Sequence, residues 1–287
     1  MPRHELSNSA LDGEILQWLH NVKGFVFDLD GTLVLGDRQN DKLTPLPGAI
    51  DFTHFLVDHG IPFVVFTNGS ARTPKKYAKV LRSLGFPIDD ADLLTPVSGA
   101  IEHFREQQHR KVMVLGGDGL TEPLREAGFE TVGPVLGSDA DAVLVGWYRQ
   151  ITFDSLEAAC DAVWSGAKFY SSSQSPFFAT TQGRVLSTSR MVSAVVQDLT
   201  DATVEVVGKP SRHALNAAAA RLVLPPAQLA VVGDDPELEV AMAHRGGALA
   251  VLVTTGLHEE SSLESLSGDR KPHLAVSGLV ELMSHFR

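Results

Sequence analysis

Residues 24–34 read Gly-Phe-Val-Phe-Asp-Leu-Asp-Gly-Thr-Leu-Val, a short apolar run that ends in polar residues. Its apolar beginning is typical of a strand that is buried on both faces. Two carboxylates follow, Asp28 and Asp30, and their spacing places them on the same side of an extended segment. Open α/β sheets bind ligands outside the carboxyl ends of their strands. Taken alone, the pair is equally consistent with a strand that ends in a polar turn.

Composition excludes several classes of partner. The chain has 287 residues, of which 44% are hydrophobic, and a formal net charge of −11, which argues against nucleic-acid and anionic membrane partners. The first twenty residues do not resemble a secretory signal, and no apolar run is long enough to span a bilayer. Cys160 is the one cysteine, so no intrachain disulfide is possible, and we expect it in the core. We therefore expect a cytoplasmic protein.

Strand and helix patterns alternate after Gly24, which predicts a mostly parallel sheet. We expect helices between Pro47 and Gly60, between Pro74 and Gly85, and at 121–127 and 153–164. We expect strands at 62–66, 111–115, 142–145, 168–170, 205–207, 229–232 and 248–253. The fold class that we predict is α/β, with a Rossmann-like parallel core formed by residues 1–92 and 190–287. Residues 1–20 would be an N-terminal extension, and 93–189 an inserted α/β domain.

Three later strand ends carry polar residues. Thr67-Asn68-Gly69-Ser70 offers hydroxyls and N–H groups where a helix start would hold an anion, although a plain helix cap is an alternative. Lys209 lies in a tight turn, Gly208-Lys209-Pro210, and alone could be a surface charge. Residues 233–239, Gly-Asp-Asp-Pro-Glu-Leu-Glu, place several carboxylates together. Such a cluster repels itself without a cation, and hard oxygen ligands favour Mg²⁺.

Taken in order, these segments resemble the four motifs of the haloacid dehalogenase (HAD) superfamily: Asp28-Leu-Asp-Gly-Thr-Leu, Thr67-Asn-Gly-Ser, Lys209 and Gly233-Asp-Asp. The long insertion between the second and third motifs is similar to the type-2 cap domain of that superfamily. Residues 141–149, Asp-Ala-Val-Leu-Val-Gly-Trp-Tyr-Arg, and 207–211, Val-Gly-Lys-Pro-Ser, resemble subclass IIA, the NagD-like or p-nitrophenylphosphatase group. The resemblance covers about residues 24–257 and implies the HAD fold.

The resemblance also implies residue roles. Asp28 would be the nucleophile that forms an aspartyl-phosphate, and Asp30 the general acid and base. Mg²⁺ would be held by Asp28, the backbone carbonyl of Asp30 and Asp234. The phosphate would be bound by Thr67, Asn68, Gly69 and Lys209. Asp235 and Glu239 would orient water and Lys209 from behind the metal.

The predicted cap departs from the family pattern. Ser172-Ser-Gln-Ser175 stands where Thr-Asn-Pro-Asp is usual, 186–190 lacks the usual glycines, and Tyr148 replaces a common acid. We expect Trp147, Tyr148, Arg149 and Gln174 to contact a leaving group more anionic or aromatic than a plain sugar. The alternative is sequence drift in loops that touch no substrate.

The function predicted is that of a Mg²⁺-dependent phosphomonoesterase acting on a small phosphorylated metabolite. Two alternatives stay open: a HAD-like binding or regulatory protein with weak turnover, and a phosphotransferase that uses the same residues. Pairing of cap domains into a homodimer is also left open. The eleven histidines show no paired metal-ligand spacing, so the sequence predicts no zinc site.

Overall fold

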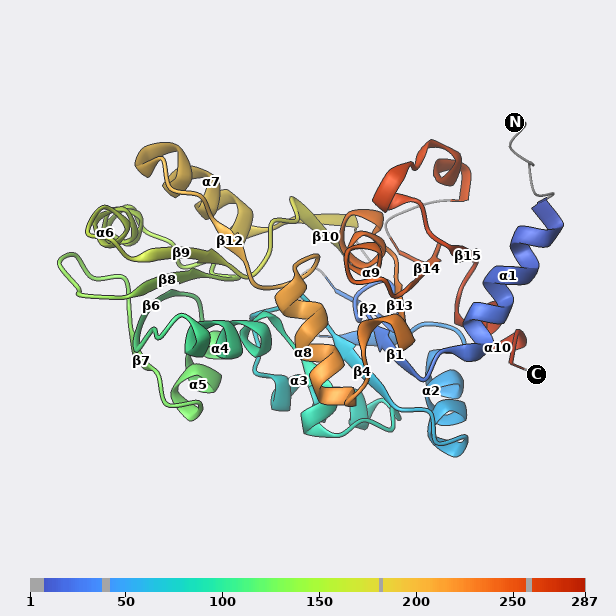
Figure 1. The fold of residues 1–287 in the computed structure, drawn as a ribbon. Coiled ribbons are helices and arrows are strands. Elements are labelled where there is room, and N and C mark those ends of the chain that lie inside the picture. Colours follow the sequence, from blue (N-terminus) through green and yellow to red (C-terminus); the bar gives the residue numbers. More distant parts are fainter. Residues whose placement is uncertain (1–7, 38–41, 181–182, 257–259, 287) are drawn as a thin grey trace.

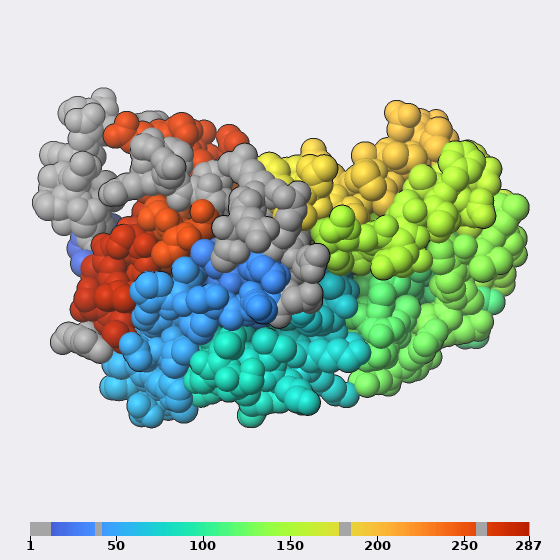
Figure 2. All heavy atoms as spheres, turned by 180° about the vertical axis from the view of Figure 1, so that it is seen from behind, coloured from blue at the N-terminus to red at the C-terminus, as the bar shows by residue number. Residues whose placement is uncertain are grey.

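The computed structural model describes residues 8–37, 42–180, 183–256 and 260–286. Two parallel sheets form two lobes, which lie side by side in Figure 1. We call the lobe that contains the first strand the core lobe and the other the cap lobe. Figure 2 shows the same division from behind, with green and gold segments in the cap lobe and blue and red segments in the core lobe.

The core sheet has the strand order β15-β14-β13-β1-β4-β5, and each adjacent pair is parallel. Its strands are β1 (Gly24–Phe27), β4 (Phe63–Phe66), β5 (Leu93–Leu94), β13 (Leu229–Gly233), β14 (Leu249–Val253) and β15 (Leu274–Val276). Phe27 of β1 lies beside Val232 on one side and Val65 on the other. The residues that follow β1, β4 and β13 therefore meet at one edge, and the predicted Rossmann-like parallel core is confirmed.

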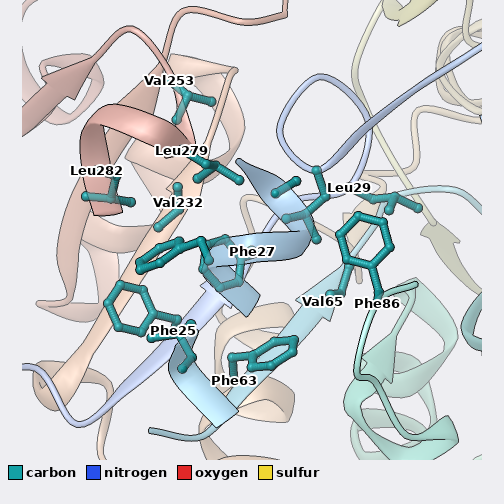
Figure 3. Close-up of a cluster of buried hydrophobic side chains, with 14 of the residues drawn as sticks. Phe25, Phe27, Leu29, Phe63, Val65, Phe86, Val232, Val253, Leu279 and Leu282 are labelled. Carbon is teal, nitrogen blue, oxygen red and sulfur yellow. The ribbon is translucent and has the colours of Figure 1, made fainter. Parts of the chain in front are cut away.

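Helices cover both faces of the core sheet because its strands are apolar on both sides. One face is covered by α1 (Asn8–Asn21), α2 (Ala49–Asp58), α3 (Pro74–Ser83) and α10 (Leu279–Ser284). On this face Phe25 and Phe27 pack against Phe52, and Figure 3 shows this cluster. The other face is covered by α8 (Arg212–Leu222) and α9 (Ala241–Gly246). Burying each such aromatic side chain contributes about 1.5–3 kcal/mol, which fixes β1 in the sheet centre.

The cap lobe is also an α/β layer structure. Its parallel sheet has the order β12-β9-β8-β6-β7, formed by β6 (Lys111–Leu115), β7 (Glu130–Val132), β8 (Ala142–Val145), β9 (Lys168–Ser171) and β12 (Glu205–Val206). One face carries α4 (Pro96–Glu106) and α5 (Asp118–Glu126), and the other carries α6 (Phe153–Trp164) and α7 (Thr188–Thr200). Cys160 is a buried residue of α6, in the core as predicted.

Two antiparallel hairpins complete the fold. The first joins β2 (Val34–Gly36) to β3 (Leu43–Pro45) shortly after β1, and the second joins β10 (Phe177–Thr180) to β11 (Gly183–Leu186) in the cap lobe. None of the helices in the described ranges combines the length and apolar composition that crossing a membrane requires.

Two elements that lie beyond or across the predicted boundary at residue 190 pack with the cap sheet. Helix α7 packs on the cap sheet, and β12 pairs with β9 through Glu205 and Val206. A short apolar run such as 205–207 indicates a strand, but its periodicity does not say which sheet the strand joins. We therefore propose that the inserted domain spans about residues 95–207 and that the core resumes at Gly208.

Candidate active site

A cavity opens at the carboxyl edge of the core sheet, between the two lobes. Its core-lobe lining is Asp28, Asp30, Thr67, Asn68, Gly69, Ser70, Ala71, Tyr77, Lys209, Asp234, Asp235, Leu238 and Glu239. Its cap-lobe lining is Trp147, Ser173, Ser175, Phe177, Ser187 and Ser189. The four predicted strand-end motifs therefore contribute to one cavity, where open α/β sheets place their ligands.

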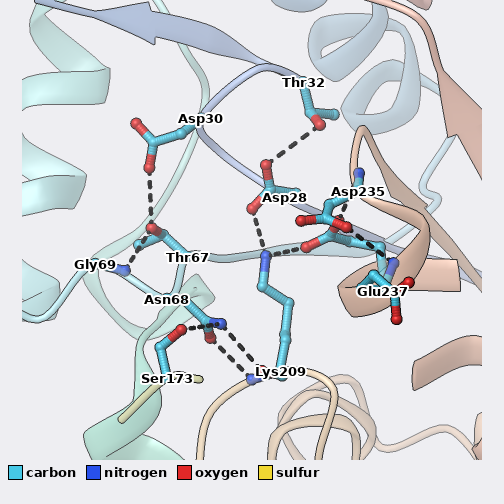
Figure 4. Close-up of polar contacts among 11 residues, drawn as sticks. Asp28, Asp30, Thr32, Thr67, Asn68, Gly69, Ser173, Lys209, Asp235 and Glu237 are labelled. Carbon is cyan, nitrogen blue, oxygen red and sulfur yellow. Dashed lines mark hydrogen bonds and ion pairs between the residues drawn. The ribbon is translucent and has the colours of Figure 1, made fainter. Parts of the chain in front are cut away.

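Lys209 is the buried cation at the centre of this site. Its side chain is 1% exposed, and its Nζ donates a hydrogen bond to Asp28 Oδ1 and lies 2.6 Å from Glu239 Oε1 (Figure 4). Burial favours the neutral amine, but the carboxylates of Asp28 and Glu239 outweigh it and raise the pKa of Lys209. The ammonium group is thus held in its charged form beside the predicted nucleophile.

Glu239 serves as the buried counter-charge to Lys209. The side chain is 1% exposed, and its Oε2 accepts the backbone N–H of Asp235 at 3.1 Å. Burial raises the pKa of Glu239, and the negative charges of Asp28 and Asp235 act in the same direction, whereas Lys209 opposes them. The predicted role of Glu239, orienting Lys209, fits this contact. The Asp235 Oδ1 accepts the backbone N–H of Glu237 at 2.8 Å and so caps the helical turn η3 (Pro236–Val240).

Asp30 lies next to the loop that follows β4. The Thr67 hydroxyl donates to Asp30 Oδ2 at 3.2 Å and accepts the backbone N–H of Gly69 at 2.9 Å. Gly31, with φ of +99°, turns the chain sharply between Asp30 and Thr32. The Thr32 hydroxyl in turn donates to Asp28 Oδ2 at 3.3 Å. The carboxylates of Asp28 and Asp30 thus have separate partners, Lys209 and Thr67 respectively.

Asn68 fixes the backbone of Lys209. Its Oδ1 accepts the Lys209 N–H at 2.8 Å, and its Nδ2 donates to the Lys209 carbonyl at 3.0 Å and to Ser173 Oγ at 3.3 Å. A Cβ on Gly208 would come within 2.1 Å of the Ser172 carbonyl oxygen, so only glycine permits this close approach. The sequence predicted a phosphate contact for Asn68, but did not reveal that its side chain holds the lysine.

The acidic side of the cavity suits a hard divalent cation. Five carboxylates line it, from Asp28, Asp30, Asp234, Asp235 and Glu239, against one ammonium group among the lining residues. Asp28 and Asp234 are buried and follow neighbouring strands. A Cβ on Gly31 would lie 2.4 Å from Asp234 Oδ2, and one on Gly256 1.9 Å, so glycine backbone encloses this carboxylate. All these donors are oxygens, the ligand type that Mg²⁺ prefers.

The structure separates the predicted cap residues into two groups. Trp147 lines the cavity, whereas Tyr148, Arg149 and Gln174 do not. A contact between substrate and these last three residues stays a prediction that the cavity lining does not support. The sequence analysis did not predict a substrate contact for the four serines that line the cavity, which are Ser173, Ser175, Ser187 and Ser189. The sequence did mark their positions, because all four lie in the two segments that depart from the family pattern, 172–175 and 186–190.

Comparisons with known proteins agree with this geometry. A family model described as haloacid dehalogenase-like hydrolase matches residues 25–130, and a HAD-hydrolase-like model matches 206–282. The 5'-nucleotidase YutF of Bacillus subtilis is 29% identical over 265 residues, which cover 92% of this chain and 98% of that protein. An acid sugar phosphatase of Staphylococcus haemolyticus is 28% identical over 91% of this chain and 95% of its own length.

Among solved structures, the p-nitrophenyl phosphatase from Archaeoglobus fulgidus superimposes with a TM-score of 0.79. It is 27% identical, and the match covers 92% of this chain and 99% of that one. The fold of this chain thus recurs in that structure over nearly the whole length of both chains. The chain belongs to the haloacid dehalogenase-like hydrolases, in the NagD and p-nitrophenylphosphatase group.

Proposed function

We propose that this chain is a magnesium-dependent phosphomonoesterase that hydrolyses a small phosphorylated metabolite through an aspartyl-phosphate on Asp28. The observation that carries the proposal is the convergence of Asp28, Asp30, Thr67, Lys209 and Asp234 on one cavity. Each of these side chains has the chemistry that one part of the reaction needs. The names of the relatives, a nucleotidase and phosphatases of small esters, support the same reaction class.

In the first step a carboxylate oxygen of Asp28 attacks phosphorus, and the bond between phosphorus and the ester oxygen breaks. Asp30 gives its proton to the departing oxygen, so the product leaves as an alcohol. Lys209 and the Thr67 hydroxyl hold the equatorial phosphoryl oxygens, where charge must be stabilised in the transition state. The ammonium of Lys209 already contacts Asp28, so it needs little reorganisation for this role.

In the second step a water attacks phosphorus of the aspartyl-phosphate and passes a proton to Asp30, now a carboxylate. The bond between phosphorus and the Asp28 oxygen breaks, which releases phosphate and regenerates Asp28. Before substrate binds, the hydrogen bond from the Thr67 hydroxyl holds the Asp30 side chain beside the phosphate loop.

Magnesium fits the oxygen donors of Asp28, Asp234 and the backbone carbonyl of Asp30. When bound, Mg²⁺ supplies positive charge that offsets the repulsion between the Asp28 carboxylate and the phosphate ester. Glycine at 31 and 256 leaves the Asp234 carboxylate in a close-fitting backbone pocket, so its position is set before any ion arrives.

The cap lining favours an uncharged, partly aromatic leaving group. Every cap-lobe residue that lines the cavity is neutral, and Trp147 and Phe177 supply aromatic faces beside four serine hydroxyls. This supports the aromatic half of our expectation for the leaving group and not the anionic half. A nucleoside monophosphate, with a flat base and hydroxylated sugar, presents complementary chemistry. Replacing Trp147 by alanine should lower kcat/KM for nucleoside monophosphates more than for glycerol phosphate, whereas Arg149→Ala should leave the ranking unchanged.

The function is tested by phosphate release from nucleoside monophosphates, sugar phosphates and p-nitrophenyl phosphate, with Mg²⁺ and with EDTA. We expect turnover that requires Mg²⁺ and falls by about 10³-fold or more in Asp28→Asn, because the nucleophile is lost. Asp89→Asn, on the exposed surface, is the matched control. Tight binding without turnover would favour the regulatory alternative, and transfer to an added alcohol in preference to water would favour the phosphotransferase. Equal activity in Asp28→Asn would refute the mechanism.

A further inference from the structure

Three side chains that are distant in sequence meet where the cap lobe joins the core lobe. They are His103 near the end of α4, Glu205 at the start of β12, and His213 at the start of α8. Each offers one ligand atom, and these atoms all lie within 4.8 Å of one another. None of the three lines the active-site cavity, so this cluster is separate from the phosphatase site.

The cluster has the spacing of metal ligands. Glu205 Oε1 lies 3.2 Å from His103 Nε2 and 2.8 Å from His213 Nε2, and the two imidazole rings are 4.1 Å apart at a tilt of 40°. In a tetrahedral zinc site with bonds near 2.0–2.1 Å, neighbouring ligand atoms are roughly 3.4 Å apart. The three atoms therefore need only small shifts to occupy three corners of such a site.

The buried ring nitrogen of His103 is a second observation that points to a ligand. Its side chain is 8% exposed, and its Nε2 has no hydrogen-bond partner among the described residues despite the nearby Glu205 oxygen. Close distance without hydrogen-bond geometry leaves a buried polar nitrogen aimed into the cluster, which is unfavourable unless another partner is supplied. A metal ion on that nitrogen would supply it.

The surroundings hold the cluster in place. A Cβ on Gly99 would lie 3.1 Å from the His213 carbonyl oxygen and 2.9 Å from that of Val207, so α4 approaches α8 and the end of β12 closely. Figure 1 shows α4 and α8 side by side at the junction of the lobes. Behind His103, a Glu106 carboxylate oxygen lies 3.9 Å from its Nδ1.

We propose that His103, Glu205 and His213 bind a divalent transition-metal ion of the zinc class. Two imidazole nitrogens and one carboxylate favour Zn²⁺, Co²⁺ or Ni²⁺ over Mg²⁺, which prefers oxygen ligands. The bound ion would connect α4, β12 and α8, and thereby join both chain crossings between the lobes. This site is independent of the proposed phosphatase activity.

The test is Zn²⁺ binding to the full chain, freed of metal, in excess Mg²⁺ that occupies the oxygen site, measured by competition with a chromophoric zinc indicator. We expect one equivalent to bind, and the affinity to fall by roughly 10- to 100-fold or more in His213→Gln and in Glu205→Gln. His59→Gln, an exposed residue directly after α2, is the control and should bind like wild type. Zn²⁺ should also raise the melting midpoint of wild type but not of the two variants.

Substituting Co²⁺ for Zn²⁺ gives a second readout, because a tetrahedral site with nitrogen ligands absorbs visible light strongly and an octahedral oxygen site only weakly. Mg²⁺-dependent phosphate release should be unchanged in His213→Gln, which shows that the variant is folded. Zn²⁺ affinity that is unchanged in both variants, or that disappears in Asp234→Asn instead, would overturn the proposal.

Discussion

Replacing Lys209 by methionine should reduce both the stability and the activity of the protein, for two separable reasons. The ammonium is buried and is paired with two carboxylates, Asp28 and Glu239. Methionine keeps the length and apolar stem of the side chain but removes the charge. The two buried carboxylates then face each other without a cation, and the phosphate loses one of its electrostatic contacts.

The size of the stability effect follows from the geometry. At an effective dielectric constant of about 20, charges 2.6 Å apart attract by roughly 6 kcal/mol, part of which offsets the cost of burying them. Removing one partner of a buried pair typically costs about 3–5 kcal/mol in the free energy of unfolding. For a protein of this size, the melting midpoint should fall by roughly 6–20 °C. Loss of one stabilising contact to the transition state should lower kcat by about 10²- to 10³-fold.

A second variant separates the two effects. Lys209→Met with Glu239→Gln removes one of the two buried carboxylates and thus their mutual repulsion, so most of the lost stability should return, while kcat should stay low. Urea and thermal unfolding are measured in EDTA, so that a bound cation does not replace the missing ammonium, and phosphate release is measured in Mg²⁺. A Lys209→Met protein as stable as wild type in EDTA, or a double variant that regains activity, would refute the reasoning.

Three further outcomes are expected. Gly256→Ala places a methyl group against the carboxylate of Asp234 and should raise the Mg²⁺ concentration needed for half-maximal activity by about 10-fold or more, whereas Gly117→Ala, which meets no atom within 4 Å, should not. Asn68→Ala removes the side chain that holds both backbone groups of Lys209 and should lower kcat by about 10-fold, and the kcat of Asn68→Asp should lie between those of wild type and Asn68→Ala. Burial lowers the pKa of His273 below its ordinary value near 6.5, so the unfolded chain takes up a proton more readily than the folded one and stability declines as the pH falls through that value. His273→Asn keeps an acceptor for the backbone N–H that His273 now binds, and its urea midpoint should change less between about pH 7 and pH 5.

The sequence was sufficient to predict those site residues that come directly after a strand. Asp28, Thr67 and Asp234 come directly after apolar runs, and the carboxyl ends of parallel strands share an edge, so local pattern was sufficient to bring them together. The strand at 142–145 and the helix at 153–164 were likewise predicted with the bounds that the structure has. The predicted helix at 121–127 begins earlier, at Asp118.

What depends on contacts between distant segments was not predictable from spacing. The strand Glu205–Val206 joins the cap sheet because it pairs with β9. A strand of two residues is too short for its own sequence to indicate which sheet it joins. The same holds for His103 and His213, which are 110 positions apart in the sequence and yet meet on adjoining helices. A histidine search based on short motifs detects pairs on one helix and misses pairs brought together by packing.

The loop from Thr67 to Ser70 has a consequence for how the enzyme discriminates by size. Asn68 Nδ2 donates to Ser173 Oγ at 3.3 Å, and Ser70 Oγ accepts the backbone N–H of Trp147 at 2.7 Å. One short segment of the core lobe therefore forms two hydrogen bonds with the cap lobe. An ester whose leaving group wedges the lobes apart must break these contacts, and with them the support that Asn68 gives to Lys209. A leaving group that is too large would therefore disturb the position of Lys209 beside the phosphate. Such a substrate would have a lower kcat and not only a higher KM.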